Sequence, residues 1–476
     1  MENKDPRLMA ATPLRVLFEK QRAAFRRSAP DYAQRLAALR SLEAAVLDGK
    51  DEIVRAMNED FGCRARQETL LLELAPLVDA IRHTRKHLAA WMRPRRVNAG
   101  INFFPARAHI MYQPLGVVGI LGAWNYQTLL SLSPLVDAIA AGNHALVKPS
   151  ELAPKTAAVL QKMIAAILPP DYIAVVTGAA QLAAEFTSLP FDHLLFTGST
   201  RIGKLVMKAA SENLTPVTLE LGGKCPAIVH REFPLRTAVE RIITGKLYNA
   251  GQTCLAPDYV FVHESQRNEF VKLASEEAQQ LYPKWSGNPD YTHIISAQHF
   301  ERLHGYVSDA ISRGATKVPL GSQEAPTSTT ERLFTPVVLL DVNDSMRVMR
   351  EEIFGPILPV LTYRDLKDAL EYVNAHERPL ALYYFDHNAG RIDHVLRTSI
   401  SGGVTINDVI YHIAQNNLPF GGVGASGMGH YHGRAGFETF SKKKGVFLQS
   451  RFSTLKFMRP PYGALTDRVI RFLLRR

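Results

Sequence analysis

A cysteine stands among small and polar residues in the stretch Gly251-Gln-Thr-Cys254-Leu-Ala-Pro257. It follows an apolar, helix-like run that breaks at Gly251, and Pro257 ends regular structure soon afterwards. This setting predicts that the thiol of Cys254 lies on a turn facing a cavity, where it can act as a nucleophile. The alternative is an inert packing cysteine, which is the commoner role of a free thiol.

An asparagine and a glutamate stand where they can serve a reacting carbonyl group. Asn125 follows an apolar segment and a glycine, and its amide can donate a hydrogen bond to an oxyanion. Glu220 ends an apolar segment among glycines, where desolvation would raise the pKa of its carboxyl group and suit a general base. The alternatives are a turn-forming role for Asn125 and an ion pair between Glu220 and Lys224.

Two further stretches have features of a dinucleotide site. Lys148 and Glu151 follow an apolar strand and can hold the hydroxyl groups of a ribose, or simply pair with each other. Gly198, Ser199 and Gly203 lie between a strand and a helix, where backbone N–H groups favour a phosphate. This segment has neither the G-x-G-x-x-G spacing nor the Lys-Ser/Thr pair of a triphosphate loop. A soft nucleophile, a base, an oxyanion donor and a dinucleotide cradle together predict covalent oxidation of a carbonyl compound.

Alternating strands and helices are expected to position these groups. From residue 116 short apolar strands alternate with helical repeats, which predicts a parallel sheet covered on both faces. Its strands are expected at 117–121, 145–147, 173–176, 193–196 and 217–219, with helices at 132–141, 156–167 and 204–210. The candidate stretches then fall at strand ends or turns, where α/β proteins bind ligands.

A second α/β set follows Gly223. Strands are expected near 227–229, 259–262, 336–341, 357–362 and 380–385, with helices at 235–248, 265–281 and 297–312. Most of 283–333 is expected to be a surface connection, because it has little periodicity. Upstream, repeats predict helices at 32–62 and 67–92, and an interrupted apolar pattern predicts an extended hairpin at 95–112.

The composition excludes several classes of protein. The 476 residues suffice for two or three domains, and 46% apolar with 21% charged residues is typical of a globular protein. Three cysteines make a disulfide framework unexpected, and their spacing fits no zinc site, so no metal is expected. The start has no signal-peptide pattern and no run suits a membrane-spanning helix, so we expect a cytoplasmic protein.

Much of the positive charge lies at the C-terminus. The net charge is +11, and residues 451–476 hold seven basic residues and one acid, Asp467. No nucleic-acid motif accompanies this charge, so no nucleic-acid partner is expected. Residues 464–476 alternate apolar and basic side chains at helical spacing. They form either a solvated tail or an amphipathic segment that contacts an anionic membrane surface.

The chain resembles the NAD(P)-dependent aldehyde dehydrogenase superfamily from about residue 15 to 450. Glu220-Leu-Gly-Gly-Lys and Gly251-Gln-Thr-Cys254 are similar to its two signature motifs. Its other landmarks are matched by Phe196-Thr-Gly-Ser-Thr, Lys148-Pro-Ser-Glu151, Glu352-Ile-Phe354-Gly-Pro and Asn407. Gly251-Gln-Thr-Cys-Leu-Ala-Pro-Asp-Tyr and Leu418-Pro-Phe420-Gly-Gly resemble the class 3 branch, and within it the bacterial coniferyl aldehyde dehydrogenases.

The resemblance implies a role for each matched residue. It makes Cys254 the nucleophile and Glu220 the base, with Asn125 and the backbone N–H of Cys254 as the oxyanion hole. For the cofactor, NAD or NADP, it implies Lys148 and Glu352 at ribose hydroxyls, Glu151 near the adenosine ribose, Gly198 and Ser199 with Gly203 at the pyrophosphate loop, and Phe354 at the nicotinamide ribose. Tyr126 and Phe420 would line the substrate funnel. The branch usually reads Asn-Tyr-Pro, and Gln127 in place of the proline is expected to loosen that turn.

The family fold implies an α/β architecture of three parts and a tail. These are a Rossmann-type cofactor domain (1–94 and 113–221), a catalytic domain (222–409), a bridging β element (95–112 and 410–450) and a basic tail (451–476). The branch also implies a homodimer and a small-molecule aldehyde, aromatic or aliphatic, as substrate. Two other functions remain open: transfer of the acyl group to coenzyme A, and a non-catalytic binding protein on the same scaffold.

Overall fold

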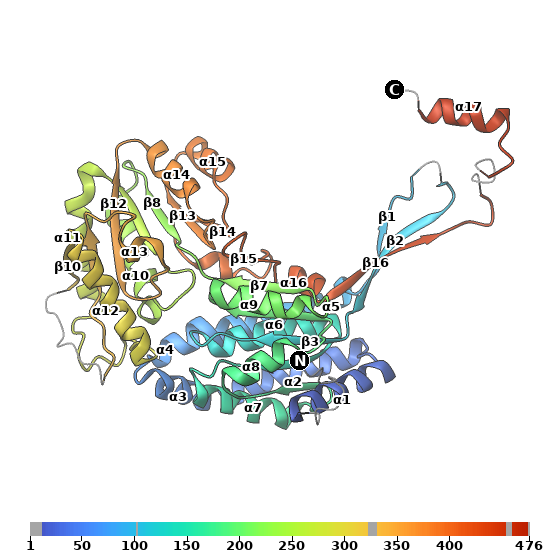
Figure 1. Ribbon diagram of the computed structural model, residues 1–476, viewed down its shortest axis with the longest axis horizontal. Coiled ribbons are helices and arrows are strands. Elements are labelled where there is room, and N and C mark those ends of the chain that lie inside the picture. Colours follow the sequence, from blue (N-terminus) through green and yellow to red (C-terminus); the bar gives the residue numbers. More distant parts are fainter. Residues whose placement is uncertain (1–11, 101–102, 322–330, 454–458, 475–476) are drawn as a thin grey trace, which may run out of the picture.

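Three β-sheets organise the part of the chain that the computed structural model describes, residues 12–100, 103–321, 331–453 and 459–474. Figure 1 shows two of them in the body of the molecule with helices packed around them, and the third in an arm that leaves the body. Each expected strand is present within two residues of its predicted bounds. The α/β fold class is therefore confirmed.

The six-stranded sheet has the order β15-β7-β6-β3-β4-β5. Its strands are β3 (Val117–Leu121), β4 (His144–Lys148), β5 (Ile173–Val175), β6 (His193–Gly198), β7 (Val217–Leu221) and β15 (Gly427–Met428). All pairings are parallel except that of β15 with β7. Leu121 is in register with Lys148 and with Phe196, and Thr197 is in register with Glu220. Three of the candidate stretches therefore end at one edge of this sheet.

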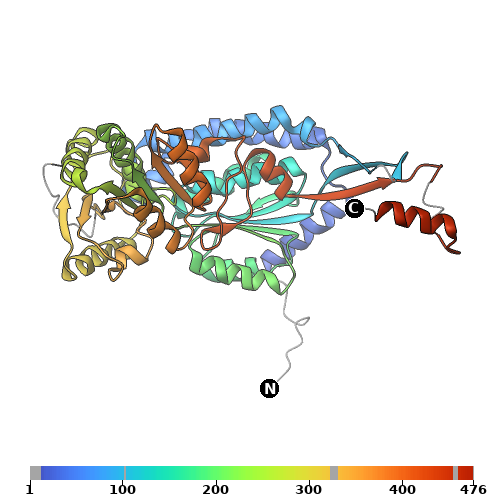
Figure 2. The same ribbon diagram turned by 90° about the horizontal axis from the view of Figure 1, so that it is seen from above.

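Helices cover both faces of that sheet because its strands are apolar throughout. All five residues of β3 and of β4 are buried. The helices are α1 (Pro13–Arg27), α2 (Tyr32–Asp48), α3 (Lys50–Phe61), α5 (Ala75–Trp91), α6 (Gln127–Ala141), α7 (Pro154–Ile167), α8 (Ala180–Thr187) and α9 (Thr200–Ser211). In Figure 2 they lie above and below the strands. Since α6 begins five residues before its predicted start, Asn125 lies directly before its first turn.

The N-terminal helices differ from the prediction in two places. The helix expected at 32–62 is divided at Gly49, which ends α2 and begins α3. A side chain at Gly49 would crowd the carbonyl oxygen of Ala45 at 2.9 Å. The helix expected at 67–92 contains a π-helical turn, Leu70–Leu74, between α4 (Arg66–Thr69) and α5.

The seven-stranded sheet has the order β10-β11-β12-β9-β8-β13-β14. Its strands are β8 (Pro226–Val229), β9 (Tyr259–His263), β10 (Thr316–Pro319), β11 (Val337–Leu340), β12 (Ile357–Tyr363), β13 (Ala381–Phe385) and β14 (Gly403–Ile406). The helices around it are α10 (Leu235–Leu247), α11 (Arg267–Leu281), α12 (Ala297–Ser312), α13 (Arg347–Arg350), α14 (Leu366–Ala375) and α15 (Ala389–Thr398). Only β10 runs antiparallel to its neighbour.

Residues 283–333 are not mainly a surface connection in their described part. Trp285 and Tyr291 are buried, with ring centroids 5.0 Å apart, and the hydroxyl of Tyr291 donates to the carbonyl oxygen of Phe334 at 2.9 Å. The expected helix at 297–312 is confirmed as α12. Isolated aromatic residues have no period, so this core contribution was invisible in the sequence.

The third sheet forms the arm. It joins β1 (Arg95–Val97), β2 (Arg107–Pro114) and β16 (Ser441–Leu448), all antiparallel. The expected hairpin at 95–112 is thus confirmed as β1 and β2, with residues 101–102 outside the described part. The arm ends near α17 (Ala464–Leu473), far from the seven-stranded sheet (Figure 1). Among the residues described, no helix combines the length and apolar character needed to cross a membrane.

Candidate active site

Cys254 lies on a loop whose backbone is sharply turned. The loop leaves α10 through a 3-10 turn, Tyr248–Gly251, in which Asn249, Ala250 and Gly251 all have positive φ. A Cβ atom at Gly251 would lie 2.3 Å from the carbonyl oxygen of Gly355, so only glycine fits there. The side chain of Cys254 is half-buried. The thiol is therefore on a turn, as its neighbours predicted.

The thiol of Cys254 is protonated in the protein alone. Burial, together with the neighbouring carboxyl groups of Glu352 and Glu220, raises its pKa to about 12. The backbone N–H groups of Cys254 and Leu255 act in the opposite direction and favour a thiolate. Nucleophilic chemistry at this sulfur thus needs an added positive charge or a base to take its proton.

Glu220 is a buried carboxyl group without a partner. It is 3% exposed, and neither of its oxygens accepts a hydrogen bond from any residue that the structure describes. Burial raises its pKa well above the usual value. The alternative partner, Lys224, instead forms an ion pair with Asp258 and donates to the carbonyl oxygen of Val348 at 2.8 Å. The carboxyl group of Glu220 is therefore buried, as predicted for a general base, and it does not pair with Lys224.

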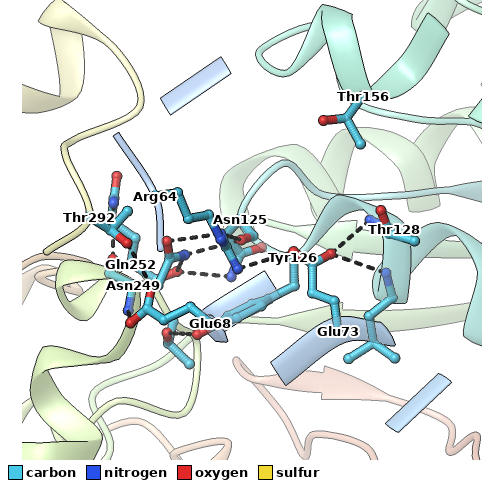
Figure 3. A network of polar contacts seen from close by, with 12 residues as sticks. Arg64, Glu68, Glu73, Asn125, Tyr126, Thr128, Thr156, Asn249, Gln252 and Thr292 are labelled. Atoms are coloured by element: carbon cyan, nitrogen blue, oxygen red, sulfur yellow. Dashed lines mark hydrogen bonds and ion pairs between the residues drawn. The ribbon is translucent and has the colours of Figure 1, made fainter. Parts of the chain in front are cut away.

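Asn125 and Tyr126 are joined to the loop that carries Cys254. The amide Nδ2 of Asn125 donates to the carbonyl oxygen of Gln252 at 3.1 Å. The hydroxyl of Tyr126 lies 2.7 Å from the Oγ1 of Thr253. In Figure 3, dashed lines join Asn125 to Asn249 and to Gln252. The two candidate catalytic stretches therefore meet.

Gln127 is held in place and does not loosen the turn by its side chain. It is fully buried at the first position of α6, and its Nε2 donates to the carbonyl oxygen of Ala153 at 2.7 Å. This bond ties the start of α6 to the segment before α7. An amide contact thus stands where the branch has proline.

The candidate cofactor residues lie along the strand edge. Lys148 is buried, and its Nζ donates to Glu151 at 3.0 Å, so the two residues pair. Ser199 caps the start of α9 by accepting from the N–H of Ile202 at 3.4 Å, with Gly198 just before it. A Cβ atom at Gly203 would meet Leu221 at 2.6 Å, so this glycine lets α9 approach β7.

Glu352 and Phe354 approach the same edge from the seven-stranded sheet. The backbone N–H of Gly223 donates to the carboxylate of Glu352. Burial, followed by repulsion from Asp258, raises the pKa of Glu352 to about 8. Phe354 has a φ of +49° and packs edge-on against Trp124, with ring centroids 5.3 Å apart. The segment 352–354 therefore contacts the end of β7 through Glu352 and the Asn125 turn through Phe354.

Phe420 belongs to an aromatic cluster. Its ring stacks on His432 with centroids 5.3 Å apart, and the rings of Tyr431 and His412 lie at 5.8 and 6.0 Å. Burial lowers the pKa of both histidines to about 4, so they are neutral at pH 7. Sequence reasoning did not single out these two histidines, because no spacing pattern links them to Phe420.

The strand edge fits a nicotinamide dinucleotide and offers no metal site. The hydroxyl of Thr197, next to Gly198, is buried with no hydrogen-bond partner in the described ranges. With the start of α9, it leaves polar groups for a phosphate and ribose, while Lys148 supplies an ammonium group and Glu352 a carboxyl group. The structure's described part has no group of three or more His, Cys, Asp or Glu able to hold a metal ion.

Comparison with known proteins agrees with this geometry. The aldehyde dehydrogenase family profile matches residues 11–446. A probable coniferyl aldehyde dehydrogenase of Pseudomonas aeruginosa is 48% identical over 458 residues, covering 96% of this chain and 95% of the relative. The coniferyl aldehyde dehydrogenase of Pseudomonas sp. strain HR199 is 44% identical over 443 residues, 92% of each.

A solved structure of Staphylococcus aureus AldH in a substrate-bound state matches with a TM-score of 0.92 and 36% identity, covering 97% of this chain and all of that one. The chain therefore belongs to the aldehyde dehydrogenase family, and it is an NAD(P)-dependent enzyme that oxidises an aldehyde to the carboxylic acid.

Proposed function

We propose that Cys254, Asn125 and Glu220 carry the reaction. The Cys254 thiol releases its proton to solvent, and the thiolate adds to the aldehyde carbon. The resulting oxyanion accepts hydrogen bonds from the amide of Asn125 and the backbone N–H of Cys254. When bound, NAD(P)+ supplies the acceptor for the hydride that leaves this carbon. Glu220 then takes a proton from the water that attacks the thioester, which releases the acid and the Cys254 thiol. The observation that carries this proposal is the bond from Asn125 to Gln252, two residues before the sulfur.

Lys148 and Glu352 are proposed to hold the cofactor's ribose hydroxyls, with Phe354 against the nicotinamide ribose. Gly198 and Ser199 would lie along the pyrophosphate, where the start of α9 favours negative charge. Glu151, whose side chain is 43% exposed and paired with Lys148, would lie near the adenosine ribose. Its negative charge opposes a second phosphate, which favours NAD over NADP. Initial rates with each cofactor at matched concentrations test this preference.

The acid, and not an acyl-coenzyme A, is the proposed product. The support is Glu220, a buried carboxyl group free to bind a water molecule. The presence of Cys254, Asn125 and Glu220 together also argues against a non-catalytic protein on this scaffold. Product analysis with and without coenzyme A tests the choice: formation of an acyl-coenzyme A at a rate equal to acid formation would contradict it.

Aromatic aldehydes such as coniferyl aldehyde are the proposed substrates, with medium- and long-chain aliphatic aldehydes second. Two relatives that are 48% and 44% identical are named for coniferyl aldehyde. The aromatic cluster around Phe420 offers flat apolar surface, and Tyr126 would line the same funnel. A substrate panel from coniferyl aldehyde to hexadecanal, run with both cofactors, tests this order. A higher kcat/KM for hexadecanal would reverse it.

We further propose that the three sheets correspond to the cofactor domain, the catalytic domain and a bridging element with the bounds given above. The arm would join two copies into a homodimer. Its support is the three-stranded sheet, whose outer strands β1 and β16 each have a free edge in the described part. Sedimentation equilibrium tests the dimer, and a monomer at micromolar concentration would contradict it.

The tail is proposed to contact an anionic membrane surface from the cytoplasmic side. The exposed apolar side chains on α17 and just after it are Leu465, Ile470, Phe472, Leu473 and Leu474. Arg468 and Arg471 add positive charge to the same helix. Co-sedimentation with phosphatidylserine-containing vesicles tests this contact, with a chain ending at Gly463 as the control. Equal amounts of both chains in the supernatant would remove the proposal.

A further inference from the structure

Arg64 is a buried arginine behind the candidate catalytic residues. It lies between α3 and α4 and is 2% exposed. Its Nη1 donates to the carbonyl oxygen of Asn125 at 2.8 Å and to the Oδ1 of Asn249 at 2.9 Å. Its Nη2 donates to Glu73 at 3.0 Å. Figure 3 shows Arg64 with Asn125 and Asn249 on one side of the network and Glu73 farther along it.

The bonds of Arg64 and of its partner Asn249 converge on the Asn125 turn, which carries the proposed oxyanion donor. Asn249 Nδ2 donates to the carbonyl oxygens of Asn125 and Gln252, both at 3.1 Å. The amide of Asn125 donates to that same Gln252 carbonyl. A primary amide has two N–H groups, so with one bound to Gln252 the direction of the other is determined. Arg64 and Asn249 hold the main chain from which this amide projects.

Two carboxylates anchor the other side of the network. Glu73 accepts from the backbone N–H groups of Thr128 and Leu129 at 2.9 and 3.3 Å, in the first turn of α6. Glu68 accepts from the backbone N–H of Asn249 at 2.9 Å. Burial raises the pKa of both carboxyl groups, and Arg64 opposes that rise. The network therefore fixes the start of α6, the Asn125 turn and the Cys254 loop to the segment 64–73.

Simple packing does not explain an arginine at this position. A buried ion pair loses its hydration, and apolar residues of similar volume often stabilise a fold as well or better. Arg64 also stacks on the rings of Phe61 and Tyr126, with its Cζ 4.9 and 5.0 Å from their centroids. Only a planar guanidinium can make these stacking contacts and the three forked bonds together.

We propose that Arg64 is a positioning residue for the oxyanion donor. It keeps the amide of Asn125 directed at the oxygen of the carbonyl group whose carbon is bound to Cys254, without touching the substrate itself. The inference rests on the proposed role of Asn125 in the reaction. Lysine at position 64 would keep the positive charge but lose the fork, and a small displacement of the donor is expected to slow the chemistry.

A double-mutant cycle tests this coupling. Arg64→Lys is expected to lower kcat for coniferyl aldehyde by about 30-fold, since misplacement near 1 Å can cost a hundredfold. In the Asn125→Ala background the same change should lower kcat by no more than about threefold, because the group that Arg64 positions is gone. Two losses that simply multiply would overturn the positioning role.

Matched variants separate positioning from general destabilisation. Arg35 is also buried, and among the described residues its hydrogen bonds go to backbone carbonyls, of Pro30 at 2.9 Å and Ala140 at 3.0 Å. Arg35→Lys should lower thermal stability yet leave kcat within about twofold. If Arg64→Lys does not fold, Asn249→Gly replaces it in the cycle, because glycine accepts the φ of +52° and the change removes the side-chain bonds of Asn249 to Asn125, Gln252 and Arg64.

The outcomes distinguish this inference from the proposed function. Wild-type kcat in Asn125→Ala would overturn the role of Asn125 and the positioning role together. A slow Asn125→Ala whose loss multiplies with those of Arg64→Lys and Asn249→Gly would overturn the positioning role alone. Equal cofactor affinity in all variants, measured by fluorescence titration, is expected and shows that the cofactor site is intact.

Discussion

The carboxylate of Glu352 occupies the space that a side chain at Gly222 would need. A Cβ atom at Gly222 would lie 2.0 Å from Oε2 of Glu352. The two residues come from opposite sheets, at the end of β7 and before β12, so their contact fixes a junction between the sheets. Only glycine at position 222 therefore leaves room for the Glu352 carboxyl group at this junction.

Gly222→Ala should impair cofactor binding more than folding. The added methyl group displaces the Glu352 carboxylate, and loss of one charge-assisted hydrogen bond costs about 1.5–3 kcal/mol. We expect the KM for NAD to rise at least about tenfold, while the far-UV spectrum stays unchanged. Gly463→Ala, where a Cβ atom would meet nothing within 4 Å, is the matched control. An unchanged KM in Gly222→Ala would contradict the assignment of Glu352 to the cofactor.

Asn125→Ala should slow turnover by a few hundredfold, and Cys254→Ala should abolish it. Removal of one oxyanion donor typically costs about 2.7–4 kcal/mol. Cys254→Ala removes the only protein atom that forms a covalent bond to substrate in the proposed reaction. Steady-state NADH formation measures both variants. Turnover that survives in Cys254→Ala would mean that another group is the nucleophile.

Glu220→Gln should block hydrolysis and leave the first half of the reaction intact. The amide cannot take a proton from water, so a burst of about one NADH per site is expected, followed by a slow phase. In the wild type the hydrolysis step should accelerate as pH rises through the raised pKa of Glu220, because the base must be ionised. A steady rate equal to that of the wild type would exclude Glu220 as the base.

The same variant should be more stable than the wild type at high pH. The folded pKa of Glu220 is raised, so the folded state binds a proton more tightly than the unfolded state. Stability from this residue is thus full below the unfolded pKa and falls as pH rises toward the folded one. Glu220→Gln has no charge to bury, and we expect a gain of about 1–3 kcal/mol at pH 8 that vanishes near pH 4. Thermal melts at both pH values measure it.

Alkylation of Cys254 should be slow in the protein without cofactor. With a pKa of about 12, only about one thiol in 10⁵ is ionised at pH 7. The iodoacetamide rate should therefore rise about tenfold per pH unit up to pH 10. Cys63→Ser removes the other half-buried thiol, while Cys225 is fully buried. A rate that levels off near pH 8 would contradict the raised pKa.

Sequence patterns predicted the sheets better than the site that they carry. Apolar runs such as 117–121 and 193–196 are readable because parallel strands are buried on both faces. The residues that support Asn125 were not readable. Arg64, Glu68 and Glu73 are charged residues of a kind that usually lies at the surface, and only tertiary packing buries them. Gln252 was visible within its motif, but its bonds to Asn249 and His293 depend on left-handed residues that no local preference specifies.

The π-helical turn at Leu70–Leu74 also sets where the chain tolerates length changes. Such a turn holds one residue more than an α-helical turn, and each residue advances the side-chain direction by about 100°. Deleting one residue there would restore a uniform α-helical pitch. The side chain of Glu73 would then be rotated away from the start of α6, or that of Arg66 would be rotated relative to the segment before it. An insertion elsewhere in the same helix would do likewise. A variant of this chain with a shortened or lengthened helix here would therefore have to hold the Asn125 turn by other side chains.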